Sequence, residues 1–180
     1  MSTGDKRPLA KAREDARAFA ALFKDQPHHR WEVAGSVRRG KAEVGDIEHV
    51  VWPVDPVAFR AAMDDMLGNP MFGTPAIIEK AVYPNGTNRW GDKYRGVMFR
   101  GFRHEVFLAD RQNWGAILTI RTGPAEFSER LVTQLKASGR LRQQDGYVKY
   151  TATGDVYATP TEEAFFAACG EPWTEPGDRQ

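Results

Sequence analysis

The sequence predicts a mixed α/β chain in which a larger lobe built around a sheet is followed by a smaller α+β lobe. Three observations lead to this class: apolar residues recur at helical spacing in several segments, runs rich in Val, Ile and Phe lie between them, and glycine- or proline-containing turns separate the two kinds of segment. With 180 residues, 41% of them hydrophobic, the chain is long enough for one sizeable core divided between two lobes. We expect the first lobe to span residues 1–110 and the second to span residues 111–180.

The first lobe is predicted to begin with a helix over residues 8–25. Its apolar stripe consists of Leu9, Ala12, Ala16, Phe19, Ala20 and Phe23. Two strands follow, in the letters WEVAG and DIEHVVWP, on either side of a glycine-rich turn. A second helix should start at Asp55, a capping residue that is followed by Pro56, and should stop at Gly68-Asn69-Pro70.

Further strands are predicted in the letters AIIEKAVY and GVMFRGFRHEVFLAD, with the loop YPNGTNRWGDKYRG between them. Two helices come after Asp110, separated by Thr122-Gly123-Pro124. A short strand pair surrounds GYVKY, and the last helix follows Thr159-Pro160-Thr161. The first lobe should therefore be the mixed α/β lobe with most of the strands, and the second a smaller α+β lobe.

Charge and composition exclude several classes of protein. The net charge is only +1, although residues 79–105 are rich in Lys and Arg and the last twenty residues are rich in Asp and Glu. Such runs are also typical of ordinary solvated faces. The single cysteine, Cys169, excludes an internal disulfide framework, and no run approaches the roughly 20 apolar residues of a membrane helix. We expect a cytoplasmic protein, of bacterial or viral origin, that has no membrane partner.

The stretch GSVRRGKAEVGDIEHVV carries the first chemical signal. Asp46 and Glu48 stand two residues apart at the start of an apolar strand, so both side chains should project from one face while Ile47 enters the core. Two neighbouring carboxylates repel each other unless solvent screens them or a cation neutralises them, and hard oxygen ligands suit Mg²⁺. Taken alone, this pair could equally lie on an exposed edge strand.

The loop before these carboxylates favours the metal-site interpretation. Gly35 and Gly45 allow a ligand to approach the backbone closely, Ser36 offers a hydroxyl, and three basic residues, Arg38, Arg39 and Lys41, supply positive charge. A Gly-Ser turn that opens a helical turn presents free backbone N–H groups to an anion. An anion site beside metal carboxylates is the arrangement of a nucleoside triphosphate site.

A third carboxylate is needed to complete a site for two metal ions. Glu105, in the letters FRHEVFLAD, is the candidate. Arg103 should lie on the same face of its strand, with Val106 and Leu108 on the other. Charged residues within an apolar strand are costly unless they are paired, which argues against Glu105 and Arg103 as surface decoration.

The sequence resembles the X-family, the DNA polymerase beta-like enzymes, in four ordered motifs. GSVRRGKAEVGDIE is similar to the motif G-S-x-R-R-G-x-x-x-x-G-D-x-D, and RHEVFLAD stands where the third catalytic strand is expected. RTGPAEFSERL is similar to the threonine-glycine segment and the helix after it, and TEEAFFAACGEPWTEPGDR is similar to the terminal helix and closing pattern. The resemblance covers roughly residues 30–179, and four motifs in order are far more specific than any one.

The resemblance implies a nucleotidyltransferase palm with a mixed sheet, a small α+β thumb, and DNA held between the two. Its carboxylate positions correspond to Asp46 and Glu48, which would hold both metal ions, and to Glu105, which would ligate the catalytic ion and activate the primer 3′-hydroxyl. Arg103 would orient these carboxylates. The incoming triphosphate would be held at Gly35, Ser36, Arg39 and the Gly45 backbone, and the thumb would add Thr122, Gly123 and Ser128 to the nucleotide site.

The implied cofactor is two Mg²⁺ ions per site, with Mn²⁺ as the alternative. The chain departs from the family's pattern because Glu48 and Glu105 replace aspartates, which lengthens two metal ligands. Ile120 and Arg121 stand where the family often has an aromatic pair, and Ala125 and Ser128 replace polar positions that usually touch the base. The helical lyase domain and the helix-hairpin-helix module are not found in the 180 residues.

Three classes of function remain open. The first is a DNA polymerase that extends a primer with deoxynucleoside triphosphates and fills short gaps in DNA repair, acting as a monomer with low processivity. Its DNA would be held by phosphate contacts from Arg89, Lys93, Arg95 and Arg100. The second is a nucleotidyltransferase that works without a template or on RNA, a small molecule or a protein. The third is a nucleic-acid-binding protein without catalysis, which is disfavoured because all three carboxylates are present.

Overall fold

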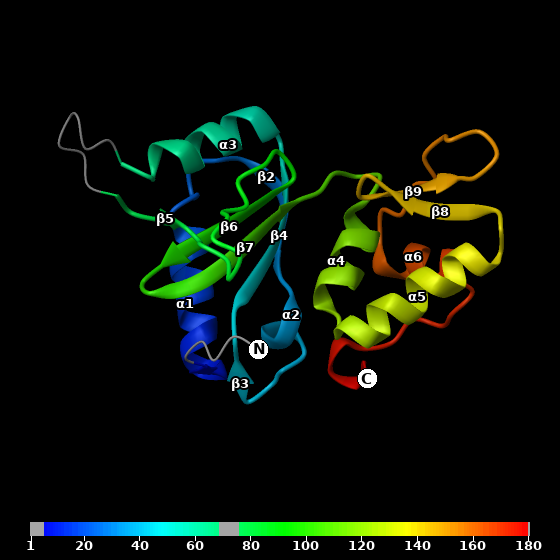
Figure 1. The fold of residues 1–180 in the computed structure, drawn as a ribbon, viewed down its shortest axis with the longest axis horizontal. Coiled ribbons are helices and arrows are strands. Elements are labelled where there is room, and N and C mark those ends of the chain that lie inside the picture. The colour runs from blue at the N-terminus through cyan, green and yellow to red at the C-terminus, as the bar shows by residue number, and fades with distance from the viewer. Residues whose placement is uncertain (1–5, 69–75, 180) are drawn as a thin grey trace.

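The computed structural model describes residues 6–68 and 76–179. Its centre is a five-stranded mixed sheet with the strand order β2-β4-β7-β6-β5 (Figure 1). The strands are β2 (His28–Val33), β4 (Ile47–Pro53), β5 (Glu79–Lys80), β6 (Tyr94–Phe99) and β7 (Phe102–Leu108). Strands β4 and β7 run parallel, and the other neighbours are antiparallel. The predicted α+β class with a mixed sheet is confirmed.

Two helices, α1 (Leu9–Ala21) and α3 (Pro56–Asp65), cover one face of this sheet. Their apolar side chains join those of β4, β6 and β7 in one buried cluster, which includes Phe19, Phe23, Phe59, Met63, Val51, Val97 and Val106. The side chain of Asp55 caps α3 by accepting hydrogen bonds from the backbone of Val57 and Ala58, as its position before Pro56 predicted. The predicted stop signal at Asn69-Pro70 lies outside the described residues.

Two short elements flank the start of β4. The turn α2 (Gly35–Arg38) follows β2 directly, and β3 (Glu43–Val44) pairs with β1 (Arg7–Pro8) in a two-stranded ribbon beside α1. The predicted glycine-rich connection between the two strands is thus a helical turn followed by a short strand. This connection brings residues 35–39 next to the start of β4.

The remaining elements form a second group, on the right in Figure 1: α4 (Trp114–Thr122), α5 (Ala125–Ala137), β8 (Leu141–Gln144), β9 (Tyr147–Tyr150), α6 (Glu162–Cys169) and the 3-10 turn η2 (Pro176–Asp178). They have a buried cluster of their own, centred on Phe127, Leu131, Leu135, Phe165 and Phe166. Thr161 caps α6 by accepting a hydrogen bond from the backbone of Ala164. No helix among the described residues is long and apolar enough to cross a membrane.

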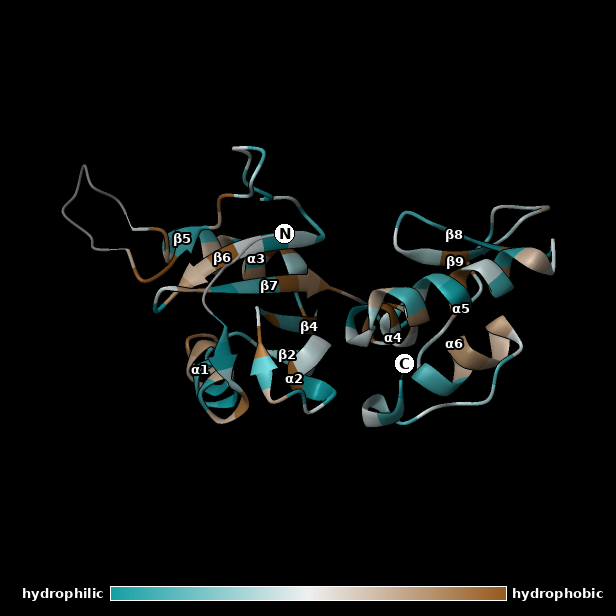
Figure 2. Cartoon of the chain, turned by 60° about the horizontal axis from the view of Figure 1, so that its bottom comes forward, coloured by the Kyte–Doolittle hydropathy of each residue, from teal (hydrophilic) through white to brown (hydrophobic). Residues whose placement is uncertain are grey.

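Helix α4 lies between the two groups, and Figure 2 shows them as separate bodies joined by the segment from β7 to α4. Trp114 and Leu118 pack against Val50 and Phe107 on the sheet, whereas Ala116 belongs to the cluster of α5 and α6. Helix α4 therefore packs against both groups and connects the sheet to the second buried cluster. We keep residue 110 as the proposed boundary between two domains.

One predicted strand is much shorter than expected. Within AIIEKAVY only Glu79–Lys80 pairs as a strand, with Met98 and Val97 of β6. The chain then turns back on itself, because the backbone N–H of Tyr83 donates to the carbonyl of Thr87 and that of Gly86 donates to the carbonyl of Tyr83. The alternating pattern correctly indicated a segment beside the sheet. Strand pairing is limited to Glu79–Lys80, because the chain turns at the Pro-Asn-Gly sequence that follows.

Candidate active site

Two of the predicted carboxylates face each other across neighbouring strands. Glu48 on β4 is the direct partner of Glu105 on β7 in the parallel register. Asp46 comes two residues before Glu48, at the start of β4, while Ile47 between them is completely buried. The structure therefore brings all three predicted carboxylates to one face of the sheet, as alternation along a strand requires.

The three carboxyl groups affect one another's ionisation. Burial, followed by the charges of Asp46 and Glu105, raises the pKa of Glu48 to about 8. Arg103 Nη2 donates to Asp46 Oδ2 at 2.8 Å, and Arg103 Nε lies 3.5 Å from Glu105 Oε1. The predicted neighbour of the carboxylates thus contacts two of them and compensates part of their charge.

The turn α2 is shaped around the longer arm of Glu48. Gly35 has a positive φ of 61°, and a Cβ at this position would lie only 2.1 Å from Glu48 Oε2. Glycine is required here for both reasons, so Gly35 makes room for a glutamate side chain beside the turn. At Gly45 a Cβ would meet no atom within 4 Å, which leaves open space beside that backbone.

A pocket of about 440 Å³ opens in front of these residues. The first group contributes Ser36, Arg39, Asp46 and Glu48 to its walls. The second group contributes the end of α4, the turn after it and the start of α5, including Arg121, Gly123 and Ser128. Side chains predicted for metal and nucleotide binding thus share one cavity between the two groups, although Glu105 does not line it.

Two residues predicted to bind the nucleotide, Arg39 and Ser128, form hydrogen bonds to backbone carbonyls beside the pocket. Arg39 donates a hydrogen bond to the carbonyl of Thr122, at the turn where Gly123 has a positive φ of 62°. Ser128 Oγ donates to the carbonyl of Ile120 at 3.0 Å, which ties the start of α5 to the end of α4. Arg39 therefore reaches from the first group across the pocket to the threonine-glycine turn.

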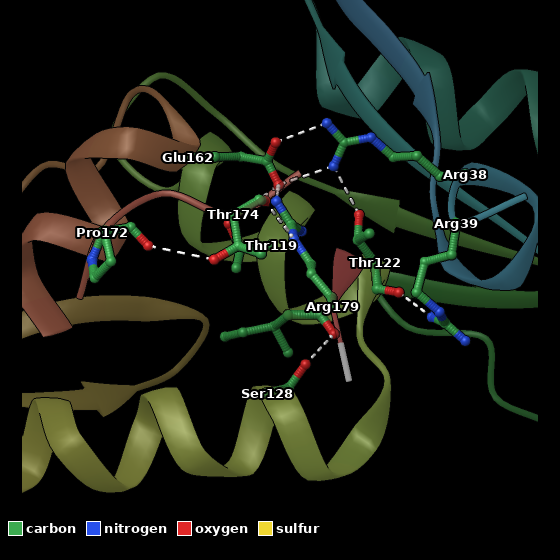
Figure 3. A network of polar contacts seen from close by, with 10 residues as sticks. Arg38, Arg39, Thr119, Thr122, Ser128, Glu162, Pro172, Thr174 and Arg179 are labelled. Carbon is green, nitrogen blue, oxygen red and sulfur yellow. Dashed lines mark hydrogen bonds and ion pairs between the residues drawn. The ribbon is translucent and has the colours of Figure 1, made fainter. Parts of the chain in front are cut away.

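An ion-pair network that sequence reasoning missed holds the two groups together beside the pocket (Figure 3). Arg38 donates to both carboxylate oxygens of Glu162, at 2.8 and 2.6 Å, and to Thr122 Oγ1 at 2.8 Å. Arg179 Nη2 lies 3.0 Å from Glu162 Oε1, and its own side chain is buried. Burial opposes ionisation of Glu162, but these arginines lower its pKa below the usual value. Of the two adjacent arginines, Arg39 therefore lines the pocket, and Arg38 pairs with Glu162 of the second group.

The four basic residues predicted to contact DNA lie in different surroundings. Arg89 is exposed and stacks over the ring of Tyr83 at 4.2 Å. Lys93 donates to the carbonyl of Asp145 at 2.7 Å, which links the first group to the β8–β9 turn. Arg100, at the turn between β6 and β7, lies 3.7 Å from Asp15 of α1.

The prediction for Arg95 is corrected by its burial. Its side chain is only 7% exposed, and Nη1 donates to the carbonyl of Arg60 at 2.8 Å and to Asp64 Oδ1 at 3.0 Å. The guanidinium also stacks over Trp90 at 4.6 Å. Arg95 therefore ties α3 to the sheet, and its guanidinium is not presented at the surface. Alternation along β6 was the signal that could have placed it on the covered face.

Three further residues of the site were not predicted. Tyr83 donates to Glu105 Oε1 at 3.1 Å, and its hydroxyl also contacts the hydroxyl of Tyr94. Arg121 lines the pocket and stacks over Phe107 at 4.0 Å, with a buried Nε that has no hydrogen-bond partner among the residues described. Nothing in the local sequence around Tyr83 signals this contact, because it depends on how the segment folds over β6.

The carboxylates suit a divalent cation by donor type, because all three offer hard oxygen ligands, and a cation would offset the burial and the neighbouring charges that raise the pKa of Glu48. In the described part of the chain, however, no group of three His, Cys, Asp or Glu side chains is arranged so that it could hold a metal ion. Asp46 is hydrogen-bonded to Arg103, and the carboxyl group of Glu48 lies beside Gly35. The residues therefore have the donor type that a divalent metal ion needs, although their side chains are not arranged around one in this structure.

Comparison with known proteins supports the fold. No protein-family model matches the sequence. Among solved structures, the chain is similar to polymerase beta of Leishmania infantum in a ternary P/T complex, with a TM-score of 0.72, 15% sequence identity, and coverage of 98% of this chain and 77% of that chain. Sequence identity this low shows the fold alone. The chain thus has the palm-and-thumb fold of polymerase beta, as its four motifs predicted.

Proposed function

We propose that this chain is a DNA polymerase that adds deoxynucleotides to a primer 3′-hydroxyl and fills short gaps in DNA repair. The observation that carries the proposal is the facing pair Glu48 and Glu105, with Asp46 beside them, where Asp46 and Glu48 line a pocket that the α2 turn and the α4–α5 turn share. Carboxylates next to an anion site are what nucleotidyl transfer requires. The polymerase beta fold is consistent with this chemistry.

The ions would be two Mg²⁺, or Mn²⁺, because the ligands are oxygens alone. Asp46 and Glu48 would hold both ions, and Glu105 would hold the catalytic one. When bound, the ions would neutralise charge on the attacking and leaving oxygens. Mn²⁺ should tolerate the longer glutamate arms better than Mg²⁺, which demands near-octahedral geometry.

The triphosphate would lie in the pocket between the two groups. Ser36 and Arg39 come from the α2 turn, the open backbone at Gly45 lies beside them, and Arg121 faces them from the end of α4. Arg121 Nε has no hydrogen-bond partner among the described residues, so it can donate to an anion in the pocket. The sugar and base would extend toward Gly123 and Ser128.

The reaction forms one bond and breaks one. The primer 3′-oxygen attacks the α-phosphorus, the bond between the α-phosphorus and the bridging oxygen breaks, and pyrophosphate leaves. Glu105 would accept the proton of the 3′-hydroxyl, and Arg103, which is ion-paired with Glu105 and Asp46, would compensate their charge. Catalysis of this kind depends on position and charge neutralisation, because no covalent intermediate with the protein is formed.

A primer-extension assay tests the proposal. The purified chain is given a gapped duplex, an open primer-template, a primer without template, or RNA, with each nucleotide supplied singly and with Mg²⁺ or Mn²⁺. We expect incorporation directed by the template and strongest on short gaps, where a 5′-phosphate or a second duplex adds contact. Extension without a template would favour the second class of function, and no incorporation with tight DNA binding would favour the third.

The assignment of the anion site has its own test. Arg39→Gln and Arg121→Gln should each weaken deoxynucleoside triphosphate binding by about tenfold or more and leave nucleoside binding and DNA binding nearly unchanged. Arg130→Gln is the matched control, because Arg130 also stacks on a phenylalanine, Phe127, at 4.9 Å but does not line the pocket. Equal losses for triphosphate and DNA would place these arginines on the DNA instead.

A further inference from the structure

The hydroxyl of Tyr83 reaches Glu105 across a glycine. Gly96 on β6 is the direct partner of Glu105 on β7. A Cβ at Gly96 would lie 2.4 Å from the hydroxyl oxygen of Tyr83. The absent side chain therefore leaves the space through which Tyr83 approaches the carboxylate, and any other residue at position 96 would displace it.

The backbone fixes Tyr83 in this place. The N–H of Ala81 donates to the carbonyl of Gly96 at 2.9 Å, and the N–H of Tyr83 donates to the carbonyl of Thr87 at 2.8 Å. The side chain of Tyr83 is buried, and the guanidinium of Arg89 covers its ring. Backbone hydrogen bonds and packing thus hold Tyr83 in one place on the sheet, whereas the longer side chain of Glu105 has more rotatable bonds.

The hydrogen-bond directions are set by the chemistry of the groups. Tyr83 has one hydroxyl proton, which it gives to Glu105 Oε1 at 3.1 Å. Tyr94 must then be the donor in its contact with Tyr83, and its own ring is stacked on Phe107 with centroids 4.7 Å apart. Burial raises the pKa of both tyrosines, so both are protonated at neutral pH and able to donate.

Tyr83 and Arg103 both approach the same oxygen of Glu105. Tyr83 donates a hydrogen bond to Oε1, and Arg103 Nε lies 3.5 Å from Oε1 in an ion pair, so these two residues leave Oε2 for another ligand. A glutamate has one more rotatable bond than an aspartate and loses more side-chain entropy when it is fixed. A donor held by the backbone can supply this constraint in advance.

We propose that Tyr83 is a positioning residue that holds the Glu105 carboxylate so that Oε2 faces the metal and the primer hydroxyl, with Tyr94 orienting the Tyr83 hydroxyl. The inference rests on the proposed function, because it assigns Tyr83 a role at that site. It explains how a glutamate can serve there, since the hydrogen bond removes the freedom that the extra methylene adds.

The main test compares Tyr83→Phe with Tyr147→Phe. Tyr147 is a matched control, because its hydroxyl also donates to a carboxylate, Asp110 Oδ2, at 2.5 Å but lies outside the pocket. Tyr83→Phe should lower kcat by about tenfold, with little change in KM for the nucleotide or in DNA affinity, whereas Tyr147→Phe should keep kcat. A wild-type kcat for Tyr83→Phe would overturn the inference.

The Glu105→Asp background shows whether the effect passes through Glu105. The shorter carboxylate cannot reach Tyr83, so Tyr83→Phe should cause no further loss of kcat in that background. An equal loss in both backgrounds would mean that Tyr83 acts elsewhere and would refute the positioning role. Thermal unfolding of each variant shows whether the changes in kcat accompany changes in folding.

A measurement without catalysis separates this inference from the proposed function. Binding of Mn²⁺ to the protein alone, followed by electron paramagnetic resonance of the free ion, should be about tenfold weaker in Tyr83→Phe than in wild type or Tyr147→Phe. If wild type binds Mn²⁺ but extends no primer, the proposed function fails and the binding comparison still tests Tyr83. Equal Mn²⁺ affinity in all three proteins, or none in wild type, would overturn the positioning role.

Discussion

The two faces of the strand pair β4 and β7 differ sharply, although neighbouring residues of the same two strands form them. On one face Glu48 and Glu105 are direct partners. On the other face, one residue away along each strand, His49 and His104 are completely buried, and their rings are stacked with centroids 5.3 Å apart. Phe19 of α1 covers both histidines, with ring centroids 4.9 and 4.7 Å away.

Hydrogen bonds satisfy most of the histidine face without charge. Trp31 Nε1 can only donate, so His49 Nδ1 accepts from it at 3.1 Å, and His49 Nε2 then donates to His104 Nδ1 at 3.0 Å. His104 Nε2 must therefore carry a proton, and it has no partner among the described residues. The carboxylate face holds like charges beside a pocket, whereas the histidine face is neutral and closed. The difference shows that this sheet keeps charge where an opposite charge pairs with it, as at Arg95, or where a pocket opens beside it, and keeps unpaired buried groups neutral.

The largest expected effect comes from the carboxylate face. Asp46→Asn keeps the shape of the side chain but removes a charge from the proposed metal site, so incorporation should fall by roughly a hundred- to thousandfold while thermal stability is retained. Primer extension and thermal unfolding measure the two outcomes. Glu43→Gln serves as the control, because Glu43 is a neighbouring exposed carboxylate, and near-wild-type incorporation by Asp46→Asn would contradict the metal assignment.

The histidine face should make folding sensitive to acid. Burial lowers the pKa of His104 to about 4, with Arg7 adding to the effect and Asp15 opposing it, and burial lowers the pKa of His49 well below its usual value. A lowered histidine pKa means that the unfolded chain binds more protons, so stability is complete above about pH 6.5 and is lost as the pH falls toward 4. The loss from His104 should be about 3 kcal/mol.

Chemical denaturation across this range measures the slope. It should be shallower in His104→Leu, which lacks the titrating group. A pH-independent free energy of unfolding between pH 6.5 and 4 in wild type would show that the buried pair does not titrate as its surroundings dictate.

His104→Leu should also separate stability from activity at neutral pH. The change leaves His49 Nε2–H without its acceptor in a buried place, which should lower the free energy of unfolding by about 2 kcal/mol. Primer extension at a temperature well below unfolding should keep most of the wild-type rate, because the leucine faces away from the pocket. A loss of rate as large as that of Asp46→Asn would mean that the two faces are coupled more tightly than their packing indicates.

The smallest expected effect is a gain in stability on the carboxylate face. Without divalent cations, Glu48→Gln removes a carboxyl group whose ionisation beside Asp46 and Glu105 is unfavourable, and at pH 9 it should raise the free energy of unfolding by on the order of 1 kcal/mol. The gain should grow as the pH rises toward and above 8, where Glu48 ionises in the wild-type protein. Unfolding at pH 6 and pH 9, in a metal chelator, measures it; a stability loss at pH 9 would indicate that Glu48 forms a stabilising contact instead.

Much of the fold could be predicted because local patterns carried it. Asp55 before Pro56, Thr161 before Glu162 and the Thr122-Gly123-Pro124 break each marked a helix boundary that the structure confirms within a few residues. Alternation along β4 and β7 placed the carboxylates on one face. The β5 strand was overestimated, because the same alternation also occurs where a segment folds over a sheet.

The sequence by itself determined which residues carry charge, where the chain turns and which side of each strand a residue faces, because these depend on spacing along the backbone. Only the tertiary structure decided which residues contact each other across the fold. The contact of Tyr83 with Glu105, the chain from Trp31 through His49 to His104, the burial of Arg95 and the Arg38–Glu162 pair all join residues from segments far apart in the chain. Such contacts depend on the register of neighbouring strands and on how α4 and α6 pack beside the sheet, which no local spacing fixes.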